Sequence, residues 1–231
     1  MQLLSILNHA SRVIKYRYEL AQKNQSPEVL VKKHFKSWSD PKHVNYKLFE
    51  ILAQELSGKP AFIVETGTSA WGTDSTRFWN TYTTKFGGKV ISIDIRDNAG
   101  IQLKYQLNRN TQLITSDSVT FLQEHPNWNV DLYYFDSADV DWLAPDFSIN
   151  HGLQELRAVA DYLNPGTIVV FDDTPISEKY VEDHLKSILL NFYELHGYFP
   201  GKGPKAIAYL REKFEIQILH HEYAFAAKII K

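Results

Sequence analysis

The sequence predicts an α/β protein in which a doubly wound, mostly parallel sheet of seven strands carries helices on both faces. From residue 60 onward, short apolar runs alternate with amphipathic segments, as in parallel α/β sheets. The last two apolar runs follow each other with almost no connector, which predicts an antiparallel hairpin at the C-terminal end. The first 58 residues carry helical spacing instead, and they predict an N-terminal helical cap.

The helical cap is expected over residues 1–58, and a single globular unit over 59–231. Ser26-Pro27 has the form of a helix start, a capping residue followed by a first-turn proline. In the next helix, apolar side chains recur every four residues, and Gly58 stands where a helix ends: Val44, Leu48, Leu52 and Leu56. The cap either closes over a substrate or forms the face of a homodimer.

Five apolar runs predict the parallel strands, because each is short, rich in β-branched or aromatic residues, and bounded by Gly, Pro, Asn or Asp. They are residues 61–65, 90–94, 111–115, 130–136 and 167–173. Helices are expected between them and after them, at 75–86, 99–109, 118–125, 150–163 and 177–196. The runs at 214–221 and 222–230 predict the two strands of the hairpin.

Composition places the chain among ordinary globular proteins and limits its partners. The 231 residues carry a formal net charge of −2 and no cysteine, so no basic field points to nucleic acid or to an anionic membrane. The longest apolar runs have the length of strands, and neither a membrane span nor a secretory signal is recognisable. We therefore expect a cytoplasmic protein.

Acidic residues stand at the end of every one of the five predicted parallel strands, or, for the third, just past it. They are Glu65, Asp94, Asp117, Asp136 and the pair Asp172-Asp173. Ligands of open α/β sheets bind outside the carboxyl ends of the strands, so these acids are expected at one rim. Like charges gathered there repel one another and favour a cationic ligand. The alternative for any single acid is that it caps the following helix.

The loop after the first strand, residues 65–76, predicts a ligand approached closely by backbone. Gly67 and Gly72 permit tight turns there, but they match neither the dinucleotide motif nor a P-loop, which would place a lysine after Gly72. Asp94, 22 residues beyond Gly72, stands where an acid accepts ribose hydroxyls in Rossmann-like sites. A nucleoside without a phosphate anchor, next to an acidic rim, favours S-adenosylmethionine, whose sulfonium is positive.

The successive segments ETGTSAWGTDST, ISIDI, TSDS, DLYYFDS and NPGTIVVFDDT resemble the motifs of class I S-adenosylmethionine-dependent methyltransferases over residues 44–230. They are most similar to the metal-dependent small-molecule O-methyltransferases of the catechol, caffeoyl-coenzyme A and macrolide-sugar type. The resemblance implies a Rossmann-like sheet with Glu65 and Gly67 at the methionine moiety, Asp94 at the ribose, and Ser116 with Asp117 at the adenine. Further cofactor contacts are expected from the same loops: Thr68, Trp71, Gly72, Ser75 and Asp136.

The resemblance also implies a Mg²⁺ ion bound by Asp136, Asp172 and Asp173. Mg²⁺ prefers carboxylate oxygens in octahedral array, which adjacent strand ends can supply. Asp172 and Asp173 point to the same side only if the strand breaks there, and Thr174-Pro175 is a plausible break. The alternative is that Asp173 caps a helix that starts near Ser177.

Asp136 and His151 are the expected catalytic residues. Catechol-type relatives carry a lysine shortly after the first metal aspartate, whereas residues 136–142 contain none, so the catechol substrate class is in doubt. His151 could accept a proton near neutral pH, and its alternative is a surface histidine at a helix start. Lys202 and Lys205 are more simply solvated charges than substrate contacts. Trp71 and Trp142 either border the pocket or pack in the scaffold.

The sequence thus predicts an S-adenosylmethionine-dependent methyltransferase that methylates a hydroxyl of a small molecule with help from Mg²⁺. One alternative keeps the cofactor but methylates nitrogen or carbon without a metal. The other is a nucleoside-binding module without catalysis. A homodimer through the N-terminal helices is a further expectation.

Overall fold

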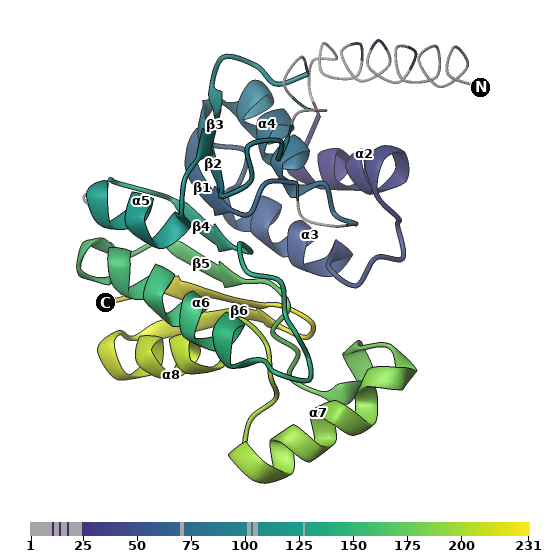
Figure 1. The fold of residues 1–231 in the computed structure, drawn as a ribbon. Coiled ribbons are helices and arrows are strands. Elements are labelled where there is room, and N and C mark those ends of the chain that lie inside the picture. Colours follow the sequence, from purple (N-terminus) through teal and green to yellow (C-terminus); the bar gives the residue numbers. More distant parts are fainter. Residues whose placement is uncertain are drawn as a thin grey trace.

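A computed structural model of the protein describes residues 11, 14, 18, 25–69, 72–100, 103, 106–126 and 128–231. Its centre is a seven-stranded sheet with the order β3-β2-β1-β4-β5-β7-β6 (Figure 1). The first five strands in the chain pair in parallel, and β7 runs antiparallel between β5 and β6. Both the parallel sheet and the terminal hairpin expected from the sequence are confirmed.

The strands occupy the apolar runs found in the sequence, with ends shifted by a few residues. They are β1 (Ala61–Thr66), β2 (Gly88–Asp94), β3 (Thr111–Thr115), β4 (Leu132–Phe135), β5 (Ile168–Phe171), β6 (Ile216–His221) and β7 (Phe225–Ile229). Every residue of β4 and β5 is buried. Leu132 and Tyr134 of β4 belong to one apolar core, and Tyr133 and Phe135 to the other, so this strand contributes to both faces of the sheet.

One face of the sheet is covered by α2 (Pro27–Trp38), α3 (Tyr46–Glu55) and α4 (Ser75–Phe86). Phe49 of α3 stacks on Trp79 of α4 with ring centroids 5.3 Å apart and lies 5.9 Å from Tyr134 of the sheet. Ser26 is the N-cap of α2 and Pro27 is its first residue, as expected from the sequence. Of residues 1–24 of the expected cap, the structure describes only 11, 14 and 18.

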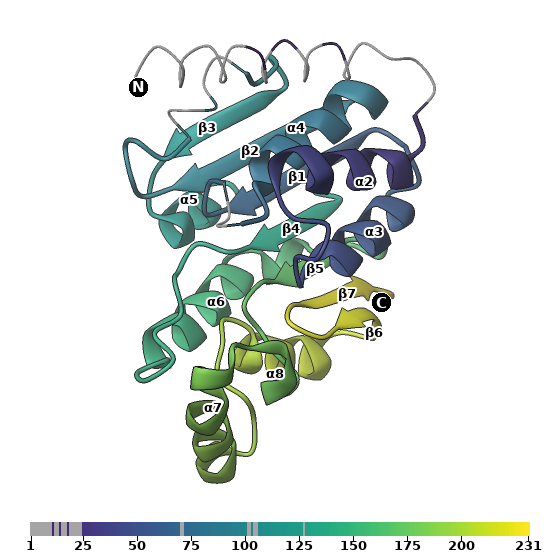
Figure 2. The ribbon, with the colours of Figure 1, turned by 90° about the vertical axis from the view of Figure 1, so that its right-hand side faces the viewer.

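The opposite face is covered by α5 (Ser118–Glu124), α6 (Asp146–Val159) and α8 (Pro204–Lys213). Single turns of 3₁₀ helix occur at η1 (Ala160–Tyr162) and η2 (Glu178–Tyr180). Helix α7 (Asp183–His196) projects away from the body of the protein (Figure 2). Leu189 is its fully buried side chain. In the described parts of the chain, no helix has the length and apolar character needed to cross a bilayer.

Four helix predictions require correction. The helix expected over 177–196 begins only at Asp183, after the separate 3₁₀ turn η2. Helix α6 begins at Asp146 rather than at 150, with Pro145 in the N-cap position. Helix α8 was not expected, because its Gly- and Pro-rich approach is typical of a loop, yet Pro204 fits the first turn, where no backbone donor is needed. At 99–109, the described residues form turns and irregular backbone instead of the expected helix, and the other positions lie outside the described residues.

Candidate functional site

A cavity of about 700 Å³ opens at the carboxyl ends of the parallel strands. It lies where the strand order reverses between β1 and β4, which is where open α/β sheets bind ligands. The loops after β1, β2, β4 and β5 contribute to its wall, together with the segment before α3 and the turn of the hairpin. The lining residues are His43–Asn45, Gly67–Ser69, Asp94–Arg96, Asp136, Ser137, Asp139, Val140, Trp142, Asp172, Asp173, Glu182 and Tyr223.

The loop after β1 passes close to the strand end of β4. Gly67 has a φ of +80°, and a Cβ at this position would lie 2.3 Å from the carbonyl oxygen of Asp136. Only glycine permits this approach, as the sequence pattern suggested. Gly72 also has a φ of +80°, and its expected Cβ would lie 2.8 Å from Nε2 of His43. Gly67 and Thr68 line the cavity, whereas Gly72 and Ser75 are not among its lining residues.

Glu65 is fully buried beneath this loop and does not line the cavity. Its carboxylate accepts hydrogen bonds from the hydroxyls of Thr76 and, at 2.7 Å, Ser92. Among the described residues, Oε1 has no hydrogen-bond partner. Burial raises the pKa of Glu65 to about 7, against the effect of the surrounding hydroxyl donors. The structure therefore separates Glu65 from the wall of the cavity, where contact with the methionine moiety was expected.

Asp94 lies at the end of β2 and lines the cavity. Its carboxylate accepts the backbone N–H groups of Thr68 and Arg96, each at 2.9 Å. It also accepts Nε of Arg96 at 2.9 Å and Nη2 at 2.7 Å. Burial opposes ionisation, but the hydrogen bonds from Arg96 and Thr68 hold the pKa of Asp94 below its usual value. The Arg96 side chain is 63% exposed, so it covers the carboxylate from the solvent side.

Ser116 and Asp117 follow β3 but do not line the cavity. Asp117 is the N-cap of α5, and its side chain accepts the backbone N–H of Thr120 at 2.8 Å. Its carboxylate thus has the helix-capping role that was the alternative for each strand-end acid. Trp71 lies outside the described residues. Trp142 lines the cavity, which agrees with the first of its two alternatives, bordering the pocket rather than packing in the scaffold.

Asp136, Asp172 and Asp173 converge on the cavity from β4 and β5. Strand β5 ends at Phe171, and Asp173 has a φ of +41°, so the extended backbone breaks between the two neighbouring acids. The break expected from Thr174-Pro175 is therefore present. Asp173 accepts a hydrogen bond of 2.6 Å from the hydroxyl of Tyr223.

Asp172 is held by an independent set of donors. Nδ2 of Asn45 donates to both of its oxygens, at 2.8 and 3.0 Å, and the hydroxyl of Tyr134 donates at 2.5 Å. Oδ1 of the buried Asn45 has no partner among the described residues, although Asn45 lines the cavity. The segment before α3 therefore contributes directly to the acidic cluster.

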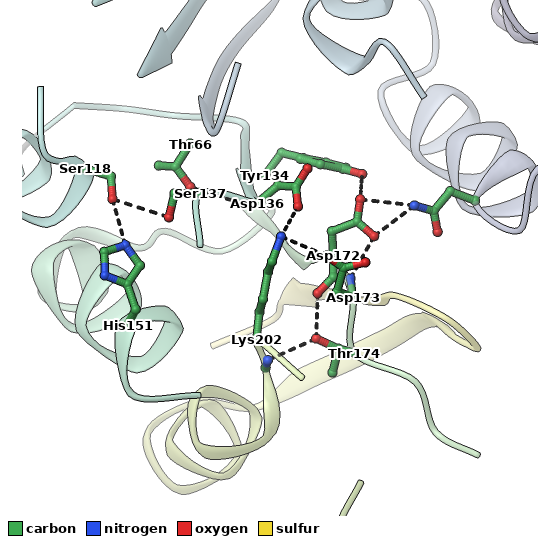
Figure 3. Close-up of polar contacts among 12 residues, drawn as sticks. Thr66, Ser118, Tyr134, Asp136, Ser137, His151, Asp172, Asp173, Thr174 and Lys202 are labelled. Atoms are coloured by element: carbon green, nitrogen blue, oxygen red, sulfur yellow. Dashed lines mark hydrogen bonds and ion pairs between the residues drawn. The ribbon is translucent and has the colours of Figure 1, made fainter. Parts of the chain in front are cut away.

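Lys202 lies at the centre of this cluster, and the prediction that it is a solvated charge is wrong. Only 3% of the residue is exposed. Its Nζ forms ion pairs with Oδ1 of Asp136 and, at 2.9 Å, with Oδ2 of Asp173 (Figure 3). Burial opposes the ammonium, but the carboxylates of Asp136 and Asp173 raise the pKa of Lys202 well above its usual value. Lys205, in contrast, is exposed as expected.

The carboxylates do not fit the magnesium site implied by the resemblance. Within the described ranges, no group of three or more His, Cys, Asp or Glu side chains is arranged to hold a metal ion. The reason is visible in the contacts: an ammonium group already pairs with Asp136 and Asp173, and amide and hydroxyl donors occupy Asp172. Mg²⁺ requires such oxygens as free ligands.

His151 lies in the second turn of α6, away from the lining of the cavity. Its Nε2 is 3.1 Å from the hydroxyl of Ser118 (Figure 3). The same nitrogen is 3.6 Å from Oε1 of Glu155. The hydrogen bond with Glu155 raises the pKa of His151. The hydroxyl of Ser137 also donates to Glu155, at 2.7 Å. This network connects α5, α6 and the loop after β4, and it gives His151 no contact with the acidic cluster.

The residues of the cavity or its cluster that were not assigned to the site from sequence include His43, Asn45, Lys202 and Tyr223. His43 and Asn45 precede α3, in a segment whose spacing indicated a helix and nothing more. Tyr223 lies in the turn that joins β6 to β7. For Lys202, the flanking Gly201 and Gly203 were an available signal, because closely packed backbone can position a side chain rigidly.

Comparisons with known proteins identify the fold. No protein-family model matches the sequence, and no curated protein sequence matches it. Among solved structures, MycE methyltransferase from the mycinamycin biosynthetic pathway, in complex with Mg, SAH and mycinamycin VI, matches with a TM-score of 0.57 and 14% identity. That match covers 91% of this chain and 56% of MycE. A second crystal form of MycE, with Mg and SAH, gives a TM-score of 0.55 and 15% identity, over 91% and 55% of the two chains.

A structure named as a candidate caffeoyl-CoA O-methyltransferase from Staphylococcus aureus gives a TM-score of 0.50 and 13% identity, over 97% of this chain and all of that one. The protein therefore has the fold of class I S-adenosylmethionine-dependent methyltransferases. It spans just over half the length of MycE.

Proposed function

We propose that the protein is an S-adenosylmethionine-dependent methyltransferase that acts on a hydroxyl group of a small molecule. One observation carries the proposal: a single cavity at the switch point of this fold joins the glycine loop, the Asp94 carboxylate and a cluster of three further acids. Solved structures of the same fold are named as complexes with SAH. The cavity volume also lies within the usual range for a cofactor and substrate site.

Asp94 is the proposed ribose acceptor. Two of its four donors are backbone N–H groups that fix the loops after β1 and β2, and the other two belong to the exposed Arg96 guanidinium. Two vicinal ribose hydroxyls can replace the guanidinium as donors if Arg96 rotates into solvent. Gly67 and Thr68 would then border the methionine part of the cofactor. Adenine contacts from Ser116 and Asp117, and a contact from Trp71, stay predictions.

The acceptor is proposed to occupy the side of the cavity near Asp136. Carboxylates there favour the positive sulfonium, while Ile95, Val140 and Trp142 supply an apolar wall for the body of a substrate. S-adenosylmethionine supplies the methyl group: its C–S bond breaks, the electron pair stays on sulfur, and a C–O bond forms to the acceptor oxygen. The hydroxyl proton passes to a cavity carboxylate, and we assign that role to Asp136.

Magnesium has no place in this reaction, because Lys202 and the amide and hydroxyl donors already engage the three acids. His151 receives no role, because its side chain contacts Ser118 and Glu155 and none of the three acids of the cluster. A homodimer through the N-terminal helices and a cytoplasmic location stay predictions.

The proposal is tested by binding and turnover with the purified full chain. Calorimetry should show one S-adenosylmethionine bound per chain, and mass spectrometry should show a methylated product and S-adenosylhomocysteine with one or more of a panel of phenols, catechols and sugar diols. Asp161→Asn serves as the control variant, because Asp161 is an exposed acid in η1, directly after α6. Methylation of nitrogen or carbon would replace the O-methylation assignment. Binding without turnover on any acceptor would favour a nucleoside-binding module, and binding of NADH instead would refute the cofactor.

A further inference from the structure

We infer that Lys202 is the resident cation of this site: its ammonium group takes the position among Asp136, Asp172 and Asp173 that a divalent metal would otherwise occupy. The site therefore needs no metal ion. The role of Lys202 toward the methyl acceptor rests on the proposed function, whereas its role as the cation of the cluster rests on geometry alone.

The contacts of the ammonium support this assignment. Nζ pairs with carboxylates from two different strand ends, Asp136 after β4 and Asp173 after β5. Its side chain is 4% exposed, so water does not screen these pairs in the way it does at a surface. A buried charge is retained only when it is paired in this manner. A lysine ammonium has three N–H donors, and in the described part of the chain two of them face these carboxylates.

The backbone around Lys202 is built to hold it there. Its N–H donates to the carbonyl of Asp173 at 3.1 Å, and the next N–H, that of Gly203, donates to Oγ1 of Thr174 at 3.0 Å. A Cβ on Gly201 would lie 2.3 Å from the carbonyl oxygen of Asp173. On the other side, a Cβ on Gly152 of α6 would lie 2.2 Å from the carbonyl oxygen of Lys202.

Glycines on both sides thus allow the segment to lie directly against the loop after β5 and against α6. The stem of Lys202 starts from a fixed backbone position next to the acids, and the side chain reaches them without crossing solvent. This arrangement distinguishes Lys202 from Lys205, which lies three residues later, is exposed, and donates to Oδ1 of Asn150 at 2.7 Å.

The ammonium has a defined chemical use if the acceptor hydroxyl binds beside Asp136. Its third N–H can donate to the acceptor oxygen and orient a lone pair toward the methyl group. As the hydroxyl loses its proton to Asp136, the oxygen gains negative charge, which a fixed positive group stabilises. A metal ion performs the same two tasks in other enzymes. Lys202 supplies both without a metal.

Metal binding tests the inference without relying on turnover. Mn²⁺ is titrated into the full-length wild-type chain and into Lys202→Met, and bound ion is measured by electron paramagnetic resonance. The wild-type protein should bind no Mn²⁺ at micromolar concentrations. Lys202→Met frees the carboxylates of Asp136 and Asp173 from their cation, so it should bind one Mn²⁺ at least about tenfold more tightly than the wild type. Lys205→Met is the matched control and should behave as the wild type.

Two results would overturn the inference. One is a wild-type chain that binds one Mn²⁺ at micromolar concentration and loses it in Asp173→Asn. The other is a folded Lys202→Met variant, judged by circular dichroism, that gains no Mn²⁺ site. If Lys202→Met does not fold, the Mn²⁺ titration of the wild type decides between the two outcomes. Lys202→Arg, which keeps the positive charge, is then the variant of this position that is titrated beside it. S-adenosylmethionine binding is measured on the same samples, so failure of the proposed function is recognised separately.

Discussion

Asp94→Asn is the substitution that most directly probes the cofactor side of the cavity. The wild-type carboxylate accepts four N–H groups, of which the two from the Arg96 side chain come from an exposed guanidinium. If ribose hydroxyls take the place of that guanidinium, they donate to a charged acceptor. Asparagine keeps the size of the side chain and one oxygen, but it loses the charge and exchanges one acceptor for a donor.

The expected magnitude follows from that exchange. A hydrogen bond to a charged group contributes about 1.5 to 3 kcal/mol, so Asp94→Asn should weaken S-adenosylmethionine binding by about 10- to 150-fold. The measurement is calorimetric titration of the wild type, Asp94→Asn and the exposed-site control Asp161→Asn. Circular dichroism establishes that each variant is folded. A folded Asp94→Asn protein whose Kd stays within about threefold of the wild type would refute the assignment of Asp94 to the ribose.

Three further predictions concern Glu65, Gly67 and His151. The pKa of Glu65 rises from 4.5 to about 7, so the native state retains a proton that the unfolded chain releases between these values. Stability should therefore fall by about 3 kcal/mol as the pH rises from about 4.5 to 7, and Glu65→Gln should flatten this dependence in denaturant titrations at several pH values; an equally steep decline in the variant would contradict it. Gly67→Ala places a Cβ 2.3 Å from the Asp136 carbonyl, whereas Gly197→Ala, with a similar φ of +75°, meets no atom within 4 Å. Thermal denaturation should show Gly67→Ala less stable than Gly197→Ala by about 1 to 3 kcal/mol, and equal stabilities would show that the close approach is relieved. His151→Gln should keep kcat within about threefold of the wild type, because His151 contacts Ser118 and Glu155 rather than the cavity; a loss of about 100-fold would restore its role as the base.

The fold was predictable because the sheet is buried on both faces. The run at 168–171 is apolar throughout because β5 contributes to both cores, and a continuous apolar run with Gly shortly before it and Asp directly after it is a strong local signal. The hairpin was predictable for a geometric reason, namely that parallel strands cannot be joined without a crossover. Helix α8 was missed because its first residues are the ones that usually mark a loop.

The positions of the acids in the candidate site were predictable from the sequence, whereas the residues that form hydrogen bonds and ion pairs with them were not. Asp94, Asp136, Asp172 and Asp173 follow strands directly, so the topology alone places them at one rim. Asn45 donates to Asp172 across 127 positions of sequence, and the tertiary fold, rather than any local pattern, brings these two together. The same holds for Lys202, whose charge gave no indication of burial.

Strand-end position was also an imperfect guide for two acids. Asp117 caps α5, because the carboxylate directly precedes a helix whose first N–H groups need acceptors. Glu65 is buried under the glycine loop, because Thr76 and Ser92 offer hydroxyl donors on that side. In both cases a neighbouring donor, invisible in the strand pattern, determines where the carboxylate points.

The most direct test of the account is a crystal structure of the protein grown with S-adenosylhomocysteine and Mn²⁺. We expect the ribose of the ligand within hydrogen-bond distance of Asp94 and its amino-acid end beside Gly67. We also expect the ammonium of Lys202 between Asp136 and Asp173, with no anomalous Mn²⁺ signal at that position. A nucleoside bound elsewhere, or an empty cavity at saturating ligand, would contradict the central claim that these strand ends form the cofactor site.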